Sequence, residues 1–533
     1  MDWPEEKRSD VIVEERFDGR IVKVYAHRDR DVNQIFTRTV ARFADKEAVV
    51  DGADRLTYQE MERQVTRLAF ALAHDLHVGK GDRVALLMEN CREFCTAALA
   101  VLQIGAVLVP LNSRLLEEEL EFLLQDSGAR VLISEAALLG VIENIRGRLT
   151  DLEHILVTGA EEVRGYLPYG SLLEKEAPWK VLANLAPEDL AVVLFTSGTG
   201  GRPRGAMITH FNLCTNLINV NRVIGTRPED RTLIAAPLFH ITGLFFQFLH
   251  MVFVGGTTIL IKRYKTLPLL ELMEKERITF FIGVPTMYIM ALSHPEFPKF
   301  ALRNWRIGAY GGAIMPDITI EHLNRSFPNL KLYNTYGATE TTGSSTALPS
   351  ELSRSHAKSV GLPFPTVECK IMDEQGKELP RGEIGEIWLR GPNVVRGYWN
   401  NPQSTASEIT EGYWHSGDIG CLDDEGLLYL KDRKKDLINR GGEKIFSIEL
   451  ENVIFGHPKV QEVAVIGVPD ELFGEQVKAV IVPKEGVSLH EDEIRDYVRQ
   501  HLADFKVPKY VSFTAELPRN PGGKVIKSKL VDL

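Results

Sequence analysis

The sequence predicts an α/β protein with a large N-terminal domain of layered, mostly parallel sheets plus a small β subdomain, followed by a small α/β C-terminal domain. Three observations support this. Short β-rich runs alternate with helix-periodic segments over the first four hundred residues, as in repeated βαβ units. After about Gly361, strand-like runs are separated by Gly and Pro. A charged joint at residues 431–436 then precedes a compact unit of about a hundred residues.

The elements of the large domain follow from hydrophobic periodicity. Residues 58–76 are expected to form a helix because apolar residues recur at 61, 65, 68, 69, 72 and 76. Short apolar runs predict the strands. The expected order is helix 58–76, strand 83–88, helix 94–104, strand 106–111, helix 116–124, strand 130–134, strand 191–195, helix 212–223, strand 257–261, helix 267–275, strand 278–282, helix 286–292 and strand 306–309.

The later elements are shorter. Strands are expected at 367–372, 385–390 and 427–430 in the β subdomain, and at 463–468, 477–482 and 510–513 in the last unit, with helices at 448–454 and 492–502. Residues 232–261 carry no formal charge and are long enough for a membrane span. Pro237, His240, Gln247 and His250 interrupt that run, so a strand, a helix and a strand of a globular core are expected instead of a span.

Composition excludes several classes of protein. The chain has 533 residues, 44% hydrophobic and 25% charged, which is typical of a soluble protein with more than one domain. A net charge of −11 argues against nucleic-acid binding and against broad binding to anionic membranes. Five cysteines predict no disulfide framework, and the N-terminus has no apolar core of a secretion signal. A cytoplasmic location is therefore expected.

The most informative stretch is residues 194–205, Leu-Phe-Thr-Ser-Gly-Thr-Gly-Gly-Arg-Pro-Arg-Gly. A buried strand enters a loop whose backbone N–H groups and hydroxyls can donate to an anion, and two arginines add positive charge. No lysine stands where a Walker loop requires it, and Pro203 occupies the third glycine position of a dinucleotide loop. The stretch predicts a triphosphate loop of another kind, with a flexible surface loop as the alternative.

Four other segments are rich in polar chemistry. Residues 310–313 (Tyr-Gly-Gly-Ala) allow close approach of a ligand to the backbone. Residues 333–340 offer an aromatic face, a hydroxyl and a carboxylate, which suit a base, a phosphate and Mg²⁺. Asp418 lies in a glycine turn that suits two ribose hydroxyls, and Lys524 lies on a loop near the C-terminus. The alternatives are a core Tyr336, a helix-capping Glu340, a turn aspartate at Asp418 and a solvated Lys524.

In their order and spacing, these segments resemble the AMP-forming acyl- and aryl-CoA synthetases of the adenylate-forming superfamily, over nearly the whole chain. The motifs that carry the resemblance are residues 196–205, 237–240, 336–340, 385–386 with 397–398, 416–418, 432–433, 441–442 and 523–524. Two positions depart from the family's loop. Gly200 replaces a hydroxyl residue, and Arg204 replaces a lysine, which keeps the charge but presents a wider fork.

The resemblance implies a ligase that uses ATP and Mg²⁺, with coenzyme A as co-substrate. A carboxylate attacks the α-phosphate of ATP to give an acyl-adenylate and pyrophosphate, and the CoA thiol then displaces AMP. By resemblance, the catalytic residues are Lys524, Glu340, Thr199 and His240, and the metal ligands are Glu340 and Thr199. The implied ATP- and AMP-binding residues are Thr196, Ser197, Gly198, Thr199, Gly200, Arg204, Gly311, Gly312, Ala313, Asn334, Tyr336, Gly337, Thr339, Asp418 and Arg433.

The resemblance also implies a mobile C-terminal domain, residues 435–533, that rotates on residues 1–434 about a hinge at Lys435. Lys524 then swings away between the two steps, and Gly441 and Gly442 line a tunnel for the pantetheine of CoA. Slim glycines suit that role because the backbone must pass close to the ligand.

The expected acid is apolar. The segment Phe239–Thr242 carries no acidic residue that could pair with a substrate ammonium, and Gly243, Leu244, Phe245, Phe246 and Phe248 follow. The acyl-pocket residues implied by the resemblance are His240, Phe245, Tyr310, Gly311 and Ala338. For His240, a core histidine is the alternative. A medium- or long-chain fatty acid is expected first, and an aryl or alicyclic acid second.

Two other functions stay open at this point. The acyl group could be delivered to a carrier-protein phosphopantetheine or another acceptor, or the fold could serve as a non-catalytic nucleotide sensor. The expected partners are ATP, CoA and a small carboxylic acid, with neither nucleic acid nor a transmembrane segment. A homodimer is left open.

Overall fold

The computed structural model describes residues 1–16, 19–159, 164–196, 202–313, 315–519, 525–531 and 533. Its first large sheet is seven-stranded and parallel except for β11, which pairs antiparallel with β10. In sheet order its strands are β11 (Arg204–Thr209), β10 (Leu190–Thr196), β6 (Val107–Leu111), β5 (Arg83–Leu87), β7 (Val131–Glu135), β8 (His154–Thr158) and β9 (Leu167–Pro168).

The second large sheet has nine strands, with parallel pairing in its middle and antiparallel strands at both edges. In sheet order they are β18 (Leu362–Pro363), β17 (Gly343–Ala347), β16 (Lys331–Ala338), β15 (Ile307–Gly311), β14 (Phe280–Gly283), β12 (Arg231–Ile234), β13 (Thr257–Leu260), β3 (Glu47–Asp51) and β4 (Asp54–Thr57).

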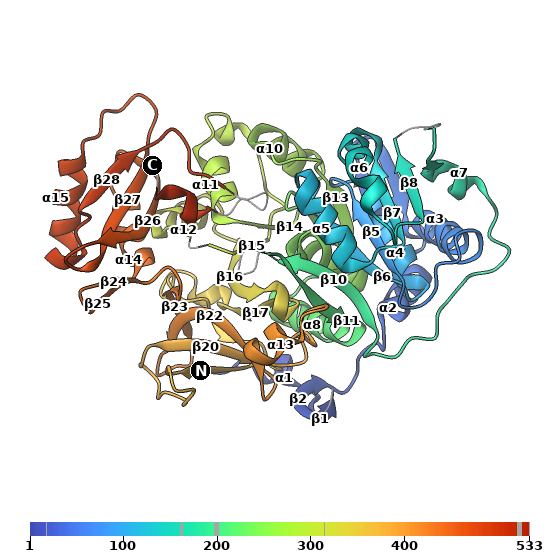
Figure 1. Cartoon of the computed structure of the whole chain (residues 1–533), viewed down its shortest axis with the longest axis horizontal. Coiled ribbons are helices and arrows are strands. Elements are labelled where there is room, and N and C mark those ends of the chain that lie inside the picture. Colours follow the sequence, from blue (N-terminus) through green and yellow to red (C-terminus); the bar gives the residue numbers. More distant parts are fainter. Residues whose placement is uncertain (17–18, 160–163, 197–201, 314, 520–524, 532) are drawn as a thin grey trace.

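Helices lie between the two sheets and on their outer faces, which gives the layered arrangement in Figure 1. The inner helices share one core with both sheets: α2 (Val32–Phe43), α3 (Tyr58–Phe70), α4 (Arg92–Gln103), α8 (His210–Ile224), the π-helix η4 (Thr242–Leu249) and α9 (His250–Val254). Separate cores on the outer faces hold α5 (Glu117–Ser127) and α6 (Leu139–Ile145) on the first sheet, and α10 (Thr266–Lys275), α11 (Pro285–Ser293) and α12 (Asp317–Ser326) on the second. The remaining helices of this part are α1 (Glu5–Arg8) and α7 (Tyr169–Glu174).

A third, antiparallel sheet forms the β subdomain, drawn in orange below the large sheets in Figure 1. Its strands are β19 (Glu368–Met372), β20 (Gly385–Arg390), β22 (Tyr413–Leu422), β21 (Ile409–Thr410) and β23 (Leu428–Arg433), and helix α13 (Pro402–Glu408) leads into β21. The chain's start lies close by, since the Met1 ammonium donates to Glu425 O in the turn between β22 and β23. The Trp3 indole donates to Pro363 O, on β18 of the second large sheet, at 2.8 Å. The chain continues as the hairpin β1 (Val11–Arg16) and β2 (Arg20–Tyr25).

The last unit lies at one end of the molecule, drawn in red in Figure 1. Its sheet contains β25 (Glu443–Ile445), β24 (Ile438–Arg440), β27 (Gly474–Pro483), β26 (Val460–Asp470) and β28 (Tyr510–Phe513), with helices α14 (Ser447–Phe455) and α15 (Glu491–His501). Its two cores contain only residues from Ile438 onward. The domain boundary expected between residues 434 and 435 falls in the turn that joins β23 to β24.

The α/β class is confirmed, and most predicted elements lie within a few residues of their observed bounds. The uncharged run 232–261 forms β12, η4 with α9, and β13, as expected. No helix in the described ranges combines the length and apolarity of a membrane span. The predicted helix 58–76 is divided, because α3 ends at Phe70 and a π-helical turn, Ala71–Asp75, follows.

Strand β11 was not predicted. The stretch after β10 returns as the second strand of a hairpin, and α8 begins only at His210. The reason is Gly205, a residue that propensity disfavours in strands. A Cβ at this position would lie 2.6 Å from Val193 Cγ1, so only glycine lets the two strands approach.

Candidate active site

The site is built where the parallel strands β15 and β16 end. Two glycines fill positions where any side chain would collide with a neighbouring strand. A Cβ on Gly311 would lie 2.4 Å from Thr335 O, and one on Gly337 would lie 2.0 Å from Gly343 O. Gly312 has a φ of +76°, which glycine adopts without strain. The glycines of both motifs are therefore required by the backbone itself.

Tyr336, Asp418 and Arg433 come together from two sheets. The buried Tyr336 donates its hydroxyl to Asp418 Oδ2 at 2.8 Å, and Arg433 Nε lies 3.4 Å from Asp418 Oδ1. Asp418 and Arg433 are register partners on β22 and β23. Burial, together with Asp418, holds the pKa of Tyr336 well above its usual value, so the phenol keeps its proton. Tyr336 is thus a core residue as well as a wall of the expected nucleotide site.

The turn that presents Asp418 is fixed from two sides. Ser416 Oγ accepts the Asp418 backbone N–H at 3.0 Å, and Gly417 has a φ of +67°. Glu386 Oε1 accepts the Gly417 N–H at 3.2 Å, while Glu386 Oε2 lies 3.0 Å from Lys434 Nζ. The motif at 385–386, to which sequence reasoning gave no role, therefore connects the expected ribose turn to the residue before Lys435.

Glu340 lies on the short 3₁₀ turn η6 (Thr339–Thr341) directly after β16. Its side chain is buried, and Oε1 accepts the hydroxyls of Thr196 at 3.1 Å and Tyr398 at 3.3 Å. Burial raises the pKa of this carboxyl. No ion pair to Glu340 occurs among the residues that the structure describes. The positive charge of Arg204 acts on the pKa of this carboxyl in the opposite direction to burial, without forming an ion pair with it. A buried carboxylate that hydroxyls hold and that has no direct ion-pair partner in the described part of the chain is a donor that fits Mg²⁺.

Arg204 lies on β11, and the protein engages its guanidinium through Nη1, whereas the buried Nε has no hydrogen-bond partner among the described residues. The guanidinium forms an ion pair with Glu408 at the end of α13, and its Cζ lies 4.5 Å from the centre of the Tyr398 ring. The ion pair with Glu408 could not be predicted, because no residue near either partner in the sequence indicates it. Tyr398 was part of a quoted motif but had no assigned role.

Several expected residues cannot be placed. Ser197, Gly198, Thr199 and Gly200 of the loop and the expected catalytic Lys524 lie outside the described residues.

The remaining residues of the expected nucleotide site lie around the same strand ends. Asn334 is buried and donates from Nδ2 to Ser359 O at 2.8 Å. Thr339 is half-buried on η6, and Ala313 is exposed after the β15 end. Of this group, Thr339 and Ala313 are open to a ligand, whereas the Asn334 amide has a protein partner.

The expected acyl-pocket residues are only partly brought together. Phe245, fully buried on η4, packs against Gly343, which is the register partner of Ala338 on β16. The Tyr310 ring instead belongs to the core on the other side of the second sheet, where its centre lies 6.4 Å from that of Tyr288. The structure therefore joins Phe245 and Ala338 but directs the Tyr310 ring elsewhere.

His240 lies in the turn before η4 and is half-buried. Its Nε2 is shielded from solvent and has no hydrogen-bond partner among the described residues. Burial lowers the pKa of His240 to about 4, so the ring is neutral near pH 7. An unpartnered imidazole nitrogen of this kind is available to a ligand.

The expected hinge and tunnel residues lie at the start of the C-terminal unit. Lys435 is exposed in the turn between β23 and β24. Gly441 and Gly442 form the two-residue turn between β24 and β25, with φ values of +60° and +97°. Positive φ at both positions is what a tight hairpin turn of this type requires, which explains the Gly-Gly pair structurally.

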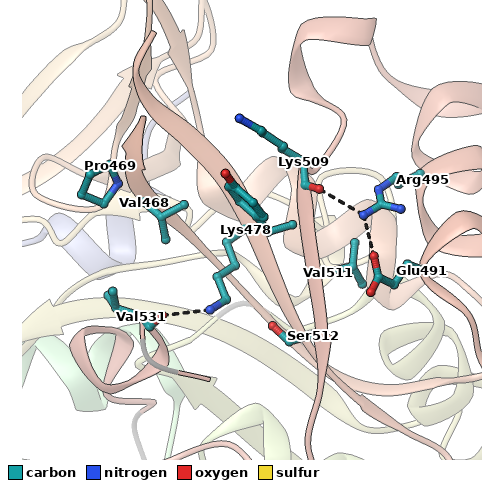
Figure 2. A pocket seen from close by; sticks show the side chains of 10 residues that line it. Val468, Pro469, Lys478, Glu491, Arg495, Lys509, Val511, Ser512 and Val531 are labelled. Carbon is teal, nitrogen blue, oxygen red and sulfur yellow. Dashed lines mark hydrogen bonds and ion pairs between the residues drawn. The ribbon is translucent and has the colours of Figure 1, made fainter. Parts of the chain in front are cut away.

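A separate hollow of about 380 Å³ lies on the C-terminal unit (Figure 2). Its cations are all engaged: Lys478 donates to Val531 O, Arg495 pairs with Glu491, and Lys509 pairs with Asp470. The hollow shares no lining residue with the strand-end site.

Comparison with known proteins gives concordant findings. Residues 36–399 match the family model of the AMP-binding enzyme, and residues 449–524 match that of the AMP-binding enzyme C-terminal domain. A feruloyl-CoA synthase of Amycolatopsis sp is 38% identical, covering 91% of this chain and 95% of that protein. A long-chain-fatty-acid–CoA ligase of Escherichia coli O6:H1 is 33% identical, covering 93% of each. The crystal structure of the anthranilate CoA ligase AuaEII in complex with anthranoyl-AMP superposes with a TM-score of 0.89 at 28% identity, covering 94% and 96%.

Proposed function

The chain belongs to the family of AMP-binding enzymes and is an acyl- or aryl-CoA ligase that works through an acyl-adenylate, and from this premise we propose its residue roles and its acid. The observation that carries the residue assignment is the meeting of Tyr336, Asp418 and Arg433 beside the strand end that leads to Glu340. In this assignment a single nucleotide contacts all three groups: the ring of Tyr336 meets its base, the carboxylate of Asp418 its ribose, and the buried carboxylate of Glu340 the metal at its phosphates.

In the first step, the substrate carboxylate attacks the α-phosphorus of ATP and pyrophosphate leaves. Two anions must meet, so positive charge is needed where they touch. We assign this charge to Lys524. Tyr336 stacks on the adenine against the Gly311–Gly312 backbone, Asp418 and Arg433 hold the ribose, and Thr339 donates to the α-phosphate.

Mg²⁺ would be held by Glu340 together with Thr199, and when bound it would neutralise charge on the phosphates. The burial of Glu340 and its lack of a paired cation in the described part of the chain support this assignment. The hydroxyls of Thr196 and Tyr398 keep the carboxylate in place.

In the second step, the CoA thiol attacks the acyl-adenylate and AMP leaves. We propose that the C-terminal domain, residues 435–533, rotates about Lys435 between the steps, so that Gly441 and Gly442 line the path of the pantetheine. The two positive-φ glycines support this, because side chains at these two positions would widen the turn and keep the ligand away from the backbone.

The acid is proposed to be apolar. The buried Phe245 wall and the neutral His240 present no charge to a substrate tail. The relative at 38% identity favours an aryl acid of the feruloyl class, and the relative at 33% favours a long-chain fatty acid. We therefore propose an aryl acid first and a fatty acid second. This reverses the order expected from the sequence, which remains an untested prediction.

The experiment is a thioester assay with ATP, Mg²⁺ and CoA across hydroxycinnamic, benzoic and C8–C18 fatty acids, with products identified by mass. The proposal expects CoA thioesters with the highest kcat/KM for aryl acids. Adenylate formation with no transfer to CoA would contradict the assigned acceptor. A highest kcat/KM for a fatty acid would contradict the assigned class.

A further inference from the structure

The Gly397–Tyr398 motif has no role in the chemistry above, yet Tyr398 contacts Glu340. Tyr398 lies between β20 and α13 and is buried. Its hydroxyl lies 2.8 Å from Glu408 Oε2 and 3.3 Å from Glu340 Oε1, and it can donate its proton to either carboxylate. Gly397 permits this placement, because a Cβ there would lie 2.6 Å from the Thr405 side chain.

The same segment also fixes the main chain of Glu340. Val395 N–H donates to Glu340 O at 2.9 Å, three residues before Tyr398. On the far side of Glu340, Thr342 has a φ of +51°, a strained value for a β-branched residue. Asn216 Nδ2 restrains that turn by donating to Thr342 O at 2.9 Å. The backbone of Glu340 is thus determined on both sides. On its side chain, Oε1 accepts the Thr196 hydroxyl at 3.1 Å and lies 3.3 Å from the Tyr398 hydroxyl, which shares its one proton between Glu340 and Glu408.

Arg204 completes the set. Two carboxylates around one hydroxyl repel each other unless one of them is neutralised. The guanidinium of Arg204 pairs with Glu408 and lies over the Tyr398 ring, so it neutralises Glu408 and holds the ring that carries the shared hydroxyl. Glu340 is left as the carboxylate without an ion-pair partner in the described part of the chain.

We propose that Tyr398 is a positioning residue that holds the Glu340 carboxylate in its cation-binding orientation, with Arg204 and Glu408 holding Tyr398. The inference rests on the proposed function, since that function assigns Mg²⁺ to Glu340. It gives Arg204 a different role from the phosphate contact expected of it: Arg204 acts through Glu408 and Tyr398.

The chain supplies a matched control. Tyr413 donates to Glu368 Oε2 at 3.1 Å, Arg390 pairs with Glu368, and Arg390 Cζ lies 4.5 Å from the centre of the Tyr413 ring. This is the same arrangement of arginine, tyrosine and glutamate, with Tyr413 buried like Tyr398. The difference is the second carboxylate, which only Tyr398 contacts.

The experiment measures Mn²⁺ binding by electron paramagnetic resonance, with the full chain and α,β-methylene-ATP, so that no turnover is needed. Outer partners of metal ligands typically contribute about 10- to 100-fold to metal affinity. Tyr398→Phe is expected to weaken Mn²⁺ binding at least tenfold, and Tyr413→Phe less than twofold. Affinity for the nucleotide without metal should change less than twofold in both variants.

Glu408→Gln keeps the proposal testable if Tyr398→Phe does not fold, which thermal unfolding reveals. It removes the carboxylate that fixes the Tyr398 hydroxyl at 2.8 Å and that holds Arg204 over the Tyr398 ring, so Tyr398 loses its support and Mn²⁺ binding is again expected to fall about tenfold.

Three outcomes overturn the inference: unchanged Mn²⁺ affinity in a folded Tyr398→Phe, an equal loss of metal-free nucleotide affinity, or equal effects of Tyr398→Phe and Tyr413→Phe. Thioester formation by the wild-type chain tests the proposed function separately and can succeed when the inference fails.

Discussion

Asp418→Asn tests the ribose site with little change in shape. The carboxylate accepts the Tyr336 hydroxyl at 2.8 Å and lies 3.4 Å from Arg433 Nε, and its side chain is 14% exposed. Asparagine has nearly the same size, so the substitution removes the charge and leaves the turn in place. The ion pair is partly exposed on the Arg433 side, so we expect its loss to cost at most about 1 kcal/mol of stability.

The effect on nucleotide binding should be larger than the effect on stability. A hydrogen bond to a charged acceptor contributes about 1.5–3 kcal/mol, against about 0.5–1.5 kcal/mol for a neutral one. With two ribose hydroxyls on Asp418, the loss is about 2 kcal/mol, which corresponds to a Kd for ATP about 30-fold higher.

Calorimetric titration with ATP and with 2′,3′-dideoxy-ATP isolates the part of the binding free energy that comes from the two ribose hydroxyls. Asp418→Asn should weaken ATP about 30-fold but dideoxy-ATP less than threefold, since the latter lacks both hydroxyls. Asp423→Asn is the control, because that carboxylate accepts the backbone N–H groups of Glu425 and Leu427 in its own turn and interacts with Tyr429, away from the Tyr336–Asp418 contact. Equal losses for the two nucleotides would refute the assignment of Asp418 to the ribose.

Three further predictions follow from the structure. Lys435→Pro should spare pyrophosphate exchange and impair thioester formation, since it stiffens the turn where rotation is proposed; equal losses in both assays would contradict the hinge. Lys527→Met should lower the free energy of unfolding by about 2 kcal/mol in urea titration, because Lys527 Nζ lies 2.8 Å from the carboxylate of Glu451, whose pKa is raised by burial. Burial lowers the pKa of His210 to about 4 and of His250 to about 3, so the unfolded chain binds more protons below pH 6.5. Each of these two histidines should lower the free energy of unfolding by about 1.4 kcal/mol at pH 5.5 relative to pH 7.5. The check is to replace one of them with glutamine, which does not titrate, and to measure unfolding at both pH values: the difference between them should shrink by that amount.

Local patterns in the sequence were enough for the fold and for the motif residues. Hydrophobic periodicity predicted the central strands β5, β6, β7, β10, β13, β14 and β15 of the two large sheets, because burial decides those positions. It did not predict several other elements: the strands β3, β4, β8, β9, β17 and β18 and the helices α2, α6 and α12. Motif order predicted Tyr336 and Asp418 as members of one site, although they are 82 residues apart. Their direct hydrogen bond could not be predicted, since it depends on how the β subdomain packs against β16.

What the sequence did not reveal depends on contacts between distant segments. Arg204 and Glu408 are 204 residues apart, and neither has a neighbour that indicates the ion pair. The Tyr310 ring was expected beside Phe245, but strand alternation on β15 directs it to the opposite core. Strand β11 was missed because Gly205 weakens its propensity while making its packing possible.

The account depends most on the ammonium of Lys524 reaching the nucleotide held by the large domain. The most direct measurement is acid-dependent pyrophosphate exchange in Lys524→Ala, with Lys529→Ala as a control, since Lys529 is an exposed lysine five positions further along the sequence. We predict a loss on the order of a thousandfold for Lys524→Ala and less than twofold for Lys529→Ala, with CoA transfer from supplied acyl-adenylate largely retained in both. Exchange at the wild-type rate in Lys524→Ala would contradict the proposed chemistry.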